Sequence, residues 1–83
     1  MNKYLISYVY YNGDMNIIHI AEDSNYIICH DANKALEHAM DYLTGQLDIV
    51  DTDGTWTYYT DELGMERAVQ VRIYDEYLME VEV

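Results

Sequence analysis

The segment Asp51-Thr52-Asp53-Gly54 comes nearest to a metal-binding motif in this chain. Alternating aspartates before a glycine are typical of an EF-hand calcium loop, in which the glycine holds the sixth position. With Gly54 in that position, the first ligand would be Ile49, and Thr60 would stand where a bidentate glutamate is required. Because both positions fail, we interpret the segment as an acidic turn and predict no metal site.

The single cysteine, Cys29, and its neighbour His30 could suggest a Cys–His nucleophile or part of a zinc site. Adjacent residues on a strand point to opposite faces, and the spacing to His19 and His38 fits no zinc pattern. We therefore interpret Cys29 as a small core residue. A lone cysteine also excludes an internal disulfide and favours a reducing compartment.

Carboxylates are so abundant that any two could be posed as a general acid and a general base. That chemistry needs one carboxyl group desolvated in a cleft, and a chain of 83 residues has little room for one. The sequence has no glycine-rich phosphate loop and no serine nucleophile motif, and only Arg67 and Arg72 could hold an anionic substrate. We predict that the protein is not an enzyme and uses no cofactor.

Sixteen Asp and Glu residues stand against four Lys and Arg, which gives a formal net charge of -12. Because 51% of the chain is apolar and ten residues are Tyr, we expect a folded single domain, residues 1–83. The abundant Ile, Asn and Tyr are typical of AT-rich coding sequence, which also favours lysine, yet only Lys3 and Lys34 occur. We therefore interpret the basic residues as excluded.

This charge balance indicates which partners fit. Binding of nucleic acid and of anionic membranes relies on Lys and Arg, so we predict neither as a direct partner. The natural complement is a basic protein surface. Tyrosines and Trp56, which are interleaved with the acids, supply the large apolar contact area of interface anchors. The residues predicted to bind this partner are Glu37, Asp41, Asp48, Asp51, Asp53, Tyr58, Tyr59, Asp61, Glu62, Glu66, Asp75 and Glu76.

The element that should organise these residues is a helix over Asp31–Gly45. Its apolar residues recur at spacings of three and four, which defines one buried stripe. Asp31 is expected to cap the first turn and Gly45 to end the last one. The stripe consists of Ala32, Ala35, Leu36, Ala39, Met40 and Leu43.

Strands are predicted on both sides of the helix. Lys3–Tyr11 and Met15–Ala21 flank Asn12-Gly13, the strongest short hairpin signal. Both faces of this hairpin are largely apolar, and we favour Leu5, Val9, Ile18 and Ile20 as core. The opposite face would then be a candidate self-association surface, made of Tyr4, Ile6, Tyr8, Tyr10 and Ile17. The other predicted extended segments are Tyr26–Cys29, Leu47–Val50, Thr55–Tyr59, Ala68–Tyr74 and Tyr77–Val83.

The alternation of apolar residues in the last two strands determines whether the loop between them has an odd or an even number of residues. A two-residue loop would put their apolar sets on opposite faces, so we predict an odd loop, Tyr74 to Glu76, that aligns Val71 with Met79. This register would also bring Arg72 near Glu80. The whole chain then reads as an α+β fold, in which one helix packs on one face of an antiparallel sheet of four to five strands. The order is strand, strand, a short third strand, helix and three further strands.

Size, acidity, aromatic content and the lack of a catalytic motif together resemble the small acidic phage proteins that block bacterial defences, including anti-CRISPR and anti-restriction inhibitors, some of which mimic DNA. The resemblance lies in the overall profile and in no shared motif, so it carries no residue roles. It implies an inhibitor that occupies the basic nucleic-acid-binding surface of a defence complex or nuclease.

Two other functions remain open from the sequence. An immunity or antitoxin-like protein would neutralise a basic toxin by the same electrostatics, and a small assembly subunit would associate through the Tyr/Ile sheet face. The chain is expected to act as a monomer or a homodimer. Its expected location is the cytoplasm, which would be that of the host cell if a phage encodes it.

Overall fold

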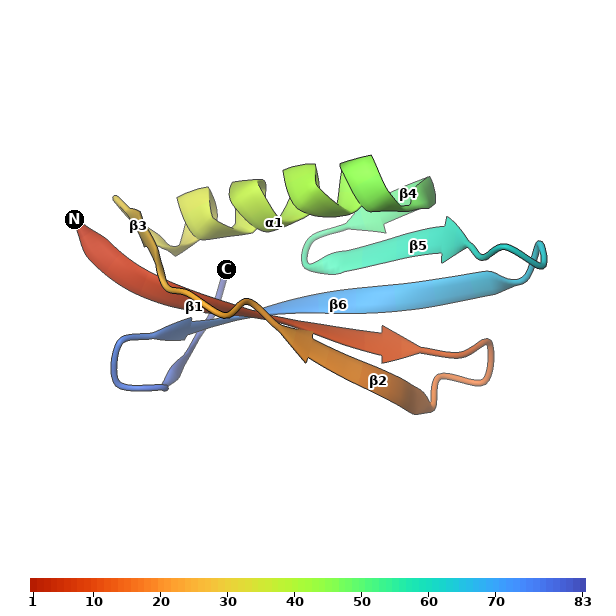
Figure 1. The fold of residues 1–83 in the computed structure, drawn as a ribbon, viewed down its shortest axis with the longest axis horizontal. Coiled ribbons are helices and arrows are strands. Elements are labelled where there is room, and N and C mark those ends of the chain that lie inside the picture. Colours follow the sequence, from red (N-terminus) through yellow and green to blue (C-terminus); the bar gives the residue numbers. More distant parts are fainter.

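The computed structural model describes residues 1–83, which form one helix and a seven-stranded antiparallel sheet. Figure 1 shows the helix lying along one side of the sheet, so the predicted α+β fold is confirmed. The elements are β1 (Asn2–Tyr11), β2 (Ile17–Glu22), β3 (Ile27–Cys29), α1 (Ala32–Gln46), β4 (Asp48–Asp53), β5 (Trp56–Thr60), β6 (Glu66–Asp75) and β7 (Glu80–Val81).

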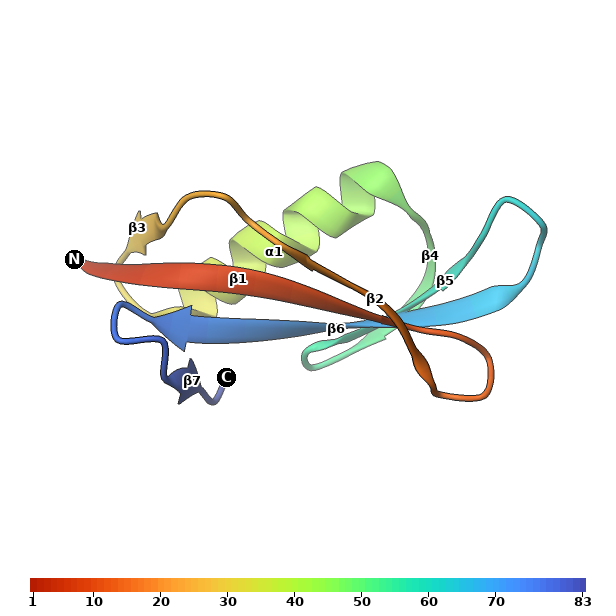
Figure 2. The same ribbon diagram turned by 60° about the horizontal axis from the view of Figure 1, so that its bottom comes forward.

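The two ten-residue strands β1 and β6 pair with each other at the centre of the sheet. The main path runs β2-β1-β6-β5-β4. Two short strands complete it, because β3 pairs with the start of β1 and β7 pairs with the end of β6 (Figure 2). The central strands are thus covered along most of their outer sides, and the exposed edges belong to β2, β4 and the two short strands.

Helix α1 begins where the sequence predicts. The Asp31 carboxylate accepts a bond of 3.0 Å from the Lys34 N–H, which confirms the predicted cap. The end differs from the prediction, because Gly45 lies inside the last turn and the helix closes with the Leu47 N–H donating to the Leu43 carbonyl. The predicted stripe is confirmed: Ala32, Ala35, Ala39 and Leu43 are buried, while Leu36 and Met40 pack against the core.

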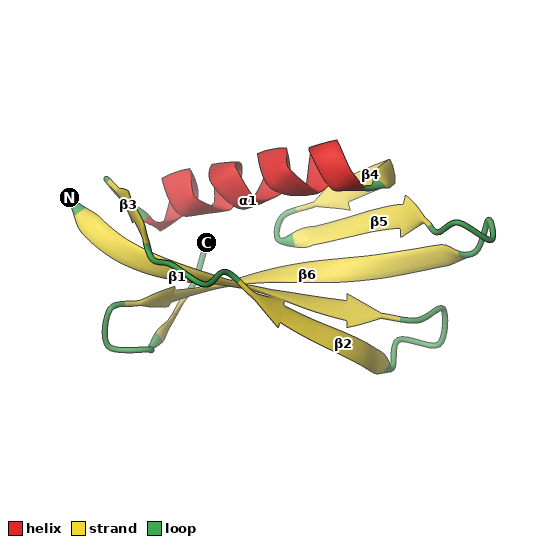
Figure 3. Cartoon of the chain, in the orientation of Figure 1, coloured by secondary structure: helices red, strands yellow, loops and turns green.

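The core lies between α1 and one face of β1, β5 and β6. Figure 3 shows the helix lying over this side of the sheet. Tyr4, Ile6 and Tyr8 are buried in it, so the predicted choice of core face in the first hairpin is wrong. Tyr10 packs against the same core, and Ile17 projects from the other side of the sheet. The reason is complementary size, since the alanine-rich stripe of α1 leaves room for tyrosine rings. A self-association surface of Tyr4, Ile6, Tyr8 and Tyr10 is therefore not available.

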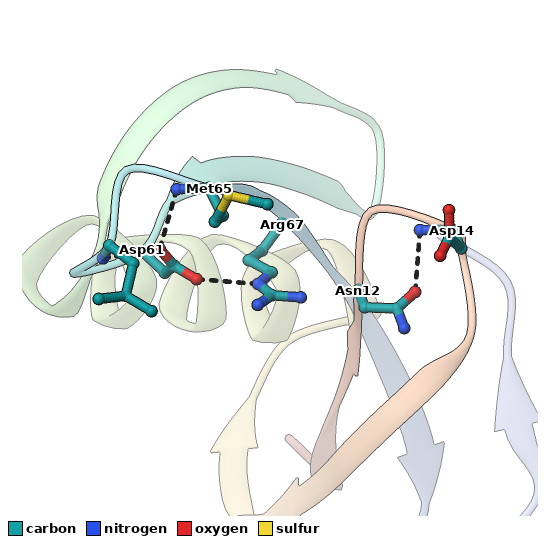
Figure 4. A network of polar contacts seen from close by, with 6 residues as sticks. Asn12, Asp14, Asp61, Met65 and Arg67 are labelled. Carbon is teal, nitrogen blue, oxygen red and sulfur yellow. Dashed lines mark hydrogen bonds and ion pairs between the residues drawn. The ribbon is translucent and has the colours of Figure 1, made fainter.

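Three hairpin turns share one geometry: Asn12–Asn16, Asp61–Met65 and Asp75–Met79. In each, the first side-chain oxygen accepts bonds from the N–H groups of the third and fifth residues, at 2.8 to 3.0 Å. The fourth residue has a positive φ in all three turns. Figure 4 shows the first two turns, which lie at the same end of the molecule. The first turn is thus longer than the predicted Asn12-Gly13 pair, and this shifts the register of β2.

The last hairpin has the predicted parity in a different register. An odd loop joins the strands, and Val69, Val71, Ile73 and Val81 all face the core. The loop is Asp75–Met79, so Tyr74 rather than Gln70 lies opposite Glu80, and only Glu80–Val81 forms a strand. The predicted closeness of Arg72 and Glu80 is confirmed, because their side chains form an ion pair at 3.7 Å.

Candidate acidic partner interface

Helix α1 leaves one side of the sheet uncovered (Figures 1 and 2), and we term this side the open face. The open face combines aromatic rings with carboxylates. Residues paired directly across antiparallel strands share a face. The register therefore places Asp51 beside Tyr58, and Tyr58 beside Ala68, whose other neighbour is Tyr11. A parallel row of the open face runs through Asp53, Trp56, Gln70, Val9 and Ile20.

Three aromatic rings form the apolar centre of the open face. The Trp56 ring lies 5.1 Å from that of Tyr11 and 6.5 Å from that of Tyr58, and it stacks on Tyr58 at 11°. Beneath them, Val9 and Ala68 are buried although no helix covers them. Trp56 and Tyr58 thus shield a second, smaller core and remain partly accessible, whereas Tyr11 is itself buried in that core.

Beside the rings, Asp48, Asp51 and Asp53 form a column along the exposed edge strand β4. Strict alternation would turn Asp48 toward the helix side, because it lies three residues before Asp51. A bulge between Ile49 and Asp51 inserts Val50 and returns Asp48 to the open face, in line with Thr60 and Glu66. We term Asp48, Asp51, Asp53 and Glu66 the open-face acids.

No basic side chain neutralises the open-face acids. The ion pairs of the protein join Lys34 to Glu37, Arg67 to Asp61 and Arg72 to Glu80. Because all four open-face acids are exposed and none belongs to these pairs, their charges face solvent together. Arg72 also lies on the open face, where it pairs with Glu80. Like charges that share one surface without ion-pair partners of their own create a negative field that attracts cations.

At the end of the open face, a depression of about 360 Å³ lies next to this column. Tyr58 and Ala68 contribute to its lining, as do Asp51 and Glu66. Arg67 also lines it, with its guanidinium held by the Asp61 carboxylate at 2.9 Å. An apolar lining with carboxylates nearby suits a long basic side chain, whose stem is apolar and whose tip is charged.

The other predicted partner residues are distributed over the rest of the surface. Glu37 and Asp41 are exposed on the outer side of α1, away from the open face, and Glu37 pairs with Lys34 at 3.2 Å. Glu62 and Glu76 are exposed in two of the turns. The structure therefore unites only Asp48, Asp51, Asp53, Tyr58 and Glu66 of the predicted set.

Three predicted partner residues have structural positions instead. The Tyr59 ring is buried in the core, which corrects its assignment as an interface anchor. Asp61 and Asp75 each hold a hairpin turn through their carboxylates. The backbone N–H of Met65 and the Arg67 side chain both donate to Asp61 and lower the pKa of its carboxyl group.

Trp56 belongs to this candidate interface, and although it is one of the aromatic residues interleaved with the acids, the predicted partner set does not include it. The alternation of Trp56-Thr57-Tyr58 contained the signal, because residues two apart on a strand share a face. Tyr11 could not be found in this way, since its proximity to Trp56 depends on the pairing of β1 with β6 and of β6 with β5.

Comparison of the chain with family models, with curated proteins and with solved structures finds no match. The helix of the structure is too short and too polar to cross a membrane. No group of three or more His, Cys, Asp or Glu side chains is arranged to hold a metal ion.

Proposed function

We propose that this protein is an acidic inhibitor that binds the basic nucleic-acid-binding surface of a bacterial defence complex or nuclease and blocks access of the nucleic acid. The observation that carries the proposal is the column of unpaired carboxylates beside Trp56 and Tyr58 on the open face. Surfaces that bind nucleic acid are rich in Lys and Arg, and these are the charges that such a column complements.

The sheet gives this surface a fixed geometry. Each open-face acid stands on a strand that is hydrogen-bonded to its neighbour, so little backbone freedom is lost on binding. Asp51 and Asp53 lie two residues apart, about 6.8 Å along the strand. A row of carboxylates at fixed spacing presents negative charge to a basic groove as a row of phosphates does. The field of a chain with net charge -12 also speeds encounter with a basic partner.

Carboxylates alone provide steering and specificity more than affinity. The aromatic centre of the open face supplies the apolar contact area that anchors an interface. In this binding mode Trp56 and Tyr58 contact the partner, and one of its Lys or Arg side chains enters the depression next to Asp51 and Glu66.

Displacement of labelled DNA tests the proposal. A restriction endonuclease, an RNA-guided nuclease and a multi-subunit RNA-guided complex would each be loaded with fluorescent duplex DNA and titrated with this protein. We expect the anisotropy of the DNA to fall to its free value for at least one of them. The apparent inhibition constant should weaken at least about tenfold between low and high salt, because screening acts on exposed charges.

The same assay separates this proposal from other modes of inhibition. DNA displacement that is insensitive to salt would place the contact on an apolar surface and contradict the charge-based mechanism. A basic nuclease toxin belongs in the panel as well, since inhibition of the toxin alone would indicate an immunity protein and overturn the anti-defence assignment.

A further inference from the structure

The two outer edges of the main sheet differ in chemistry. Strand β4 carries Asp48, Asp51 and Asp53, and charged side chains disfavour pairing of an edge with another strand. A bulge interrupts both edge strands, at Val50 in β4 and at Ile18 in β2. The chain has no charged residue from Met15 to Ala21, which includes most of β2. On β2, Ile17, Ile18 and Ile20 are each between 53% and 56% exposed. An exposed apolar edge strand is a template for strand pairing.

Charge is also segregated along the sequence. Residues 1–21, which make up the first hairpin except for its last residue, Glu22, contain one acid, Asp14, and one base, Lys3, and are electrically neutral. The net charge of -12 therefore lies entirely in residues 22–83. Two copies of this chain repel each other over most of their surface, and the β2 edge is the long strand edge at which they can meet without bringing acids together.

We propose that a second copy of the chain pairs with β2, antiparallel and about a two-fold axis through His19. In this register Ile18 of one copy lies opposite Ile20 of the other, and Ile17 lies opposite Ala21. Glu22 meets the neutral Asn16 rather than a second carboxylate. A register centred on Ile18 would instead place Asp14 opposite Glu22, where like charges are unfavourable.

From His19 to Glu22 the backbone of β2 follows a regular ladder with β1 and is suited to this pairing, and Ile18 is the inserted residue of the bulge that comes before it. The Asp23 N–H donates to the Ile6 carbonyl, and bonded and non-bonded residue pairs alternate along an antiparallel ladder. Tyr10 and His19 consequently form a bonded pair, and the N–H and C=O of Ile20 point away from β1. Pairing of two copies would continue the sheet across the axis and leave an acidic β4 at each outer end.

Sedimentation equilibrium of the full chain tests the proposal. We expect a concentration-dependent mass that approaches twice 9.8 kDa. Ile18→Lys and Ile20→Lys should each weaken self-association at least about tenfold, because each removes an isoleucine that becomes buried when the dimer forms. Val50→Lys is the matched control, because it adds the same charge at a residue that is 59% exposed on the opposite edge of the sheet. Added salt should strengthen the dimer by screening repulsion, the opposite of its effect on binding to a basic partner.

A cysteine cross-link tests the register independently. In a Cys29→Ser background, oxidised His19→Cys should form a disulfide-linked dimer, because residues facing each other across the axis have Cα atoms within disulfide range. Ile17→Cys should not, since two copies of residue 17 would lie about 14 Å apart along the strands. A monomer up to millimolar concentration, or a dimer that survives both lysine substitutions, would overturn the proposal. If the lysine variants instead weaken binding of another protein to a monomer, the edge belongs to that protein's strand.

Discussion

Met15, Gly64 and Leu78 occupy the same left-handed position in three hairpin turns, with φ of 62°, 80° and 62°. A side chain in this region brings Cβ close to the following carbonyl oxygen, at a cost of about 1 kcal/mol, whereas glycine adopts it freely. Only one of the three turns uses glycine. The two exposed side chains, Met15 and Leu78, therefore hold a strained backbone without contributing to the core.

Replacement of these side chains should stabilise the protein. We expect Met15→Gly and Leu78→Gly each to raise the free energy of unfolding by up to about 0.5 kcal/mol, which is what remains after the greater freedom of glycine in the unfolded chain is subtracted. Urea denaturation followed by circular dichroism would measure the change. A loss of stability at both positions would show that the side chains make contacts worth more than the strain.

Glycine-to-alanine changes should have opposite effects at two sites. Gly64→Ala should lower the free energy of unfolding by about 1 kcal/mol, because alanine resists a φ of 80°. Gly45→Ala should raise it by about 0.5–1 kcal/mol, since Gly45 lies inside α1 and a Cβ there meets no atom within 4 Å. Urea denaturation would measure both changes. If the two substitutions shifted the free energy of unfolding in the same direction, the assigned backbone conformations would be contradicted.

Asp61 links the second turn to pH. Its carboxyl pKa is lowered from 3.8 because the Met65 N–H and the Arg67 side chain favour the ionised form. The resulting stability is complete above this ordinary pKa and is lost as the pH falls through the lower pKa of the folded state. Asp61→Asn should keep the turn, as Asn12 does in the first turn, and lose this contribution.

Unfolding measured between pH 6 and pH 2 would separate these effects. The stability difference between the native chain and Asp61→Asn should be constant above about pH 5 and shrink below about pH 4. Asp53→Asn controls for the removal of one charge, because Asp53 belongs to none of the ion pairs. A difference that does not change with pH would show that the ionised carboxylate contributes nothing beyond the acceptor that asparagine keeps.

At the level of elements, α1 is predictable because its cap and stripe are local features. The stripe and the Asp31 cap were identified from spacing alone, whereas the end of the helix was missed, because a helical Gly45 has no sequence signal that distinguishes it from a terminal one. The core face of β1 was not predictable. Both faces of the first hairpin are apolar, and the choice depends on the fit of Tyr4 and Tyr8 against Ala35 and Ala39, which lie far away in sequence.

Single substitutions on the two faces of the first hairpin test this assignment. Ile6 is fully buried, so Ile6→Ala should lower the free energy of unfolding by about 3 kcal/mol. Ile20 is 54% exposed in the single chain, so Ile20→Ala should cost less than about 1 kcal/mol when measured at a concentration where the protein is monomeric. A larger loss of stability for Ile20→Ala than for Ile6→Ala would mean that the core lies on the face of the hairpin that was predicted from the sequence.

The bulge in β4 is the second feature beyond the reach of the sequence. The acidic character of Asp48, Asp51 and Asp53 is evident in the sequence, but the predicted turn at Asp51-Thr52-Asp53-Gly54 is wrong, because Asp51 and Asp53 lie within β4. Strict alternation along this strand would also put Asp48 and Asp51 on different faces. The inserted Val50 places all three on the open face beside Trp56 and Tyr58. The residue types of the candidate interface were therefore largely predictable, and their arrangement was not, because it depends on strand pairing across β4, β5 and β6.

For the whole molecule, the central question is whether the net charge or its arrangement carries the function. Besides the open-face acids, the chain has a scattered set of acids on α1 and in the turns, which includes Glu37, Asp41, Glu62 and Glu76. If net charge alone mattered, equal losses of charge would weaken inhibition equally. If the open face is the interface, loss of charge there should weaken inhibition more than the same loss elsewhere. The reason is that salt screens distant charges more strongly than charges that lie at the contact.

The most direct measurement is DNA displacement by two variants that have lost the same charge. One combines Asp48→Asn, Asp51→Asn, Asp53→Asn and Glu66→Gln, and the other combines Glu37→Gln, Asp41→Asn, Glu62→Gln and Glu76→Gln. We predict that the first loses at least about 100-fold in inhibition at moderate salt, and that the second loses less than about fivefold. Equal losses in the two variants, or a larger loss in the second, would contradict the assignment of the open face as the interface.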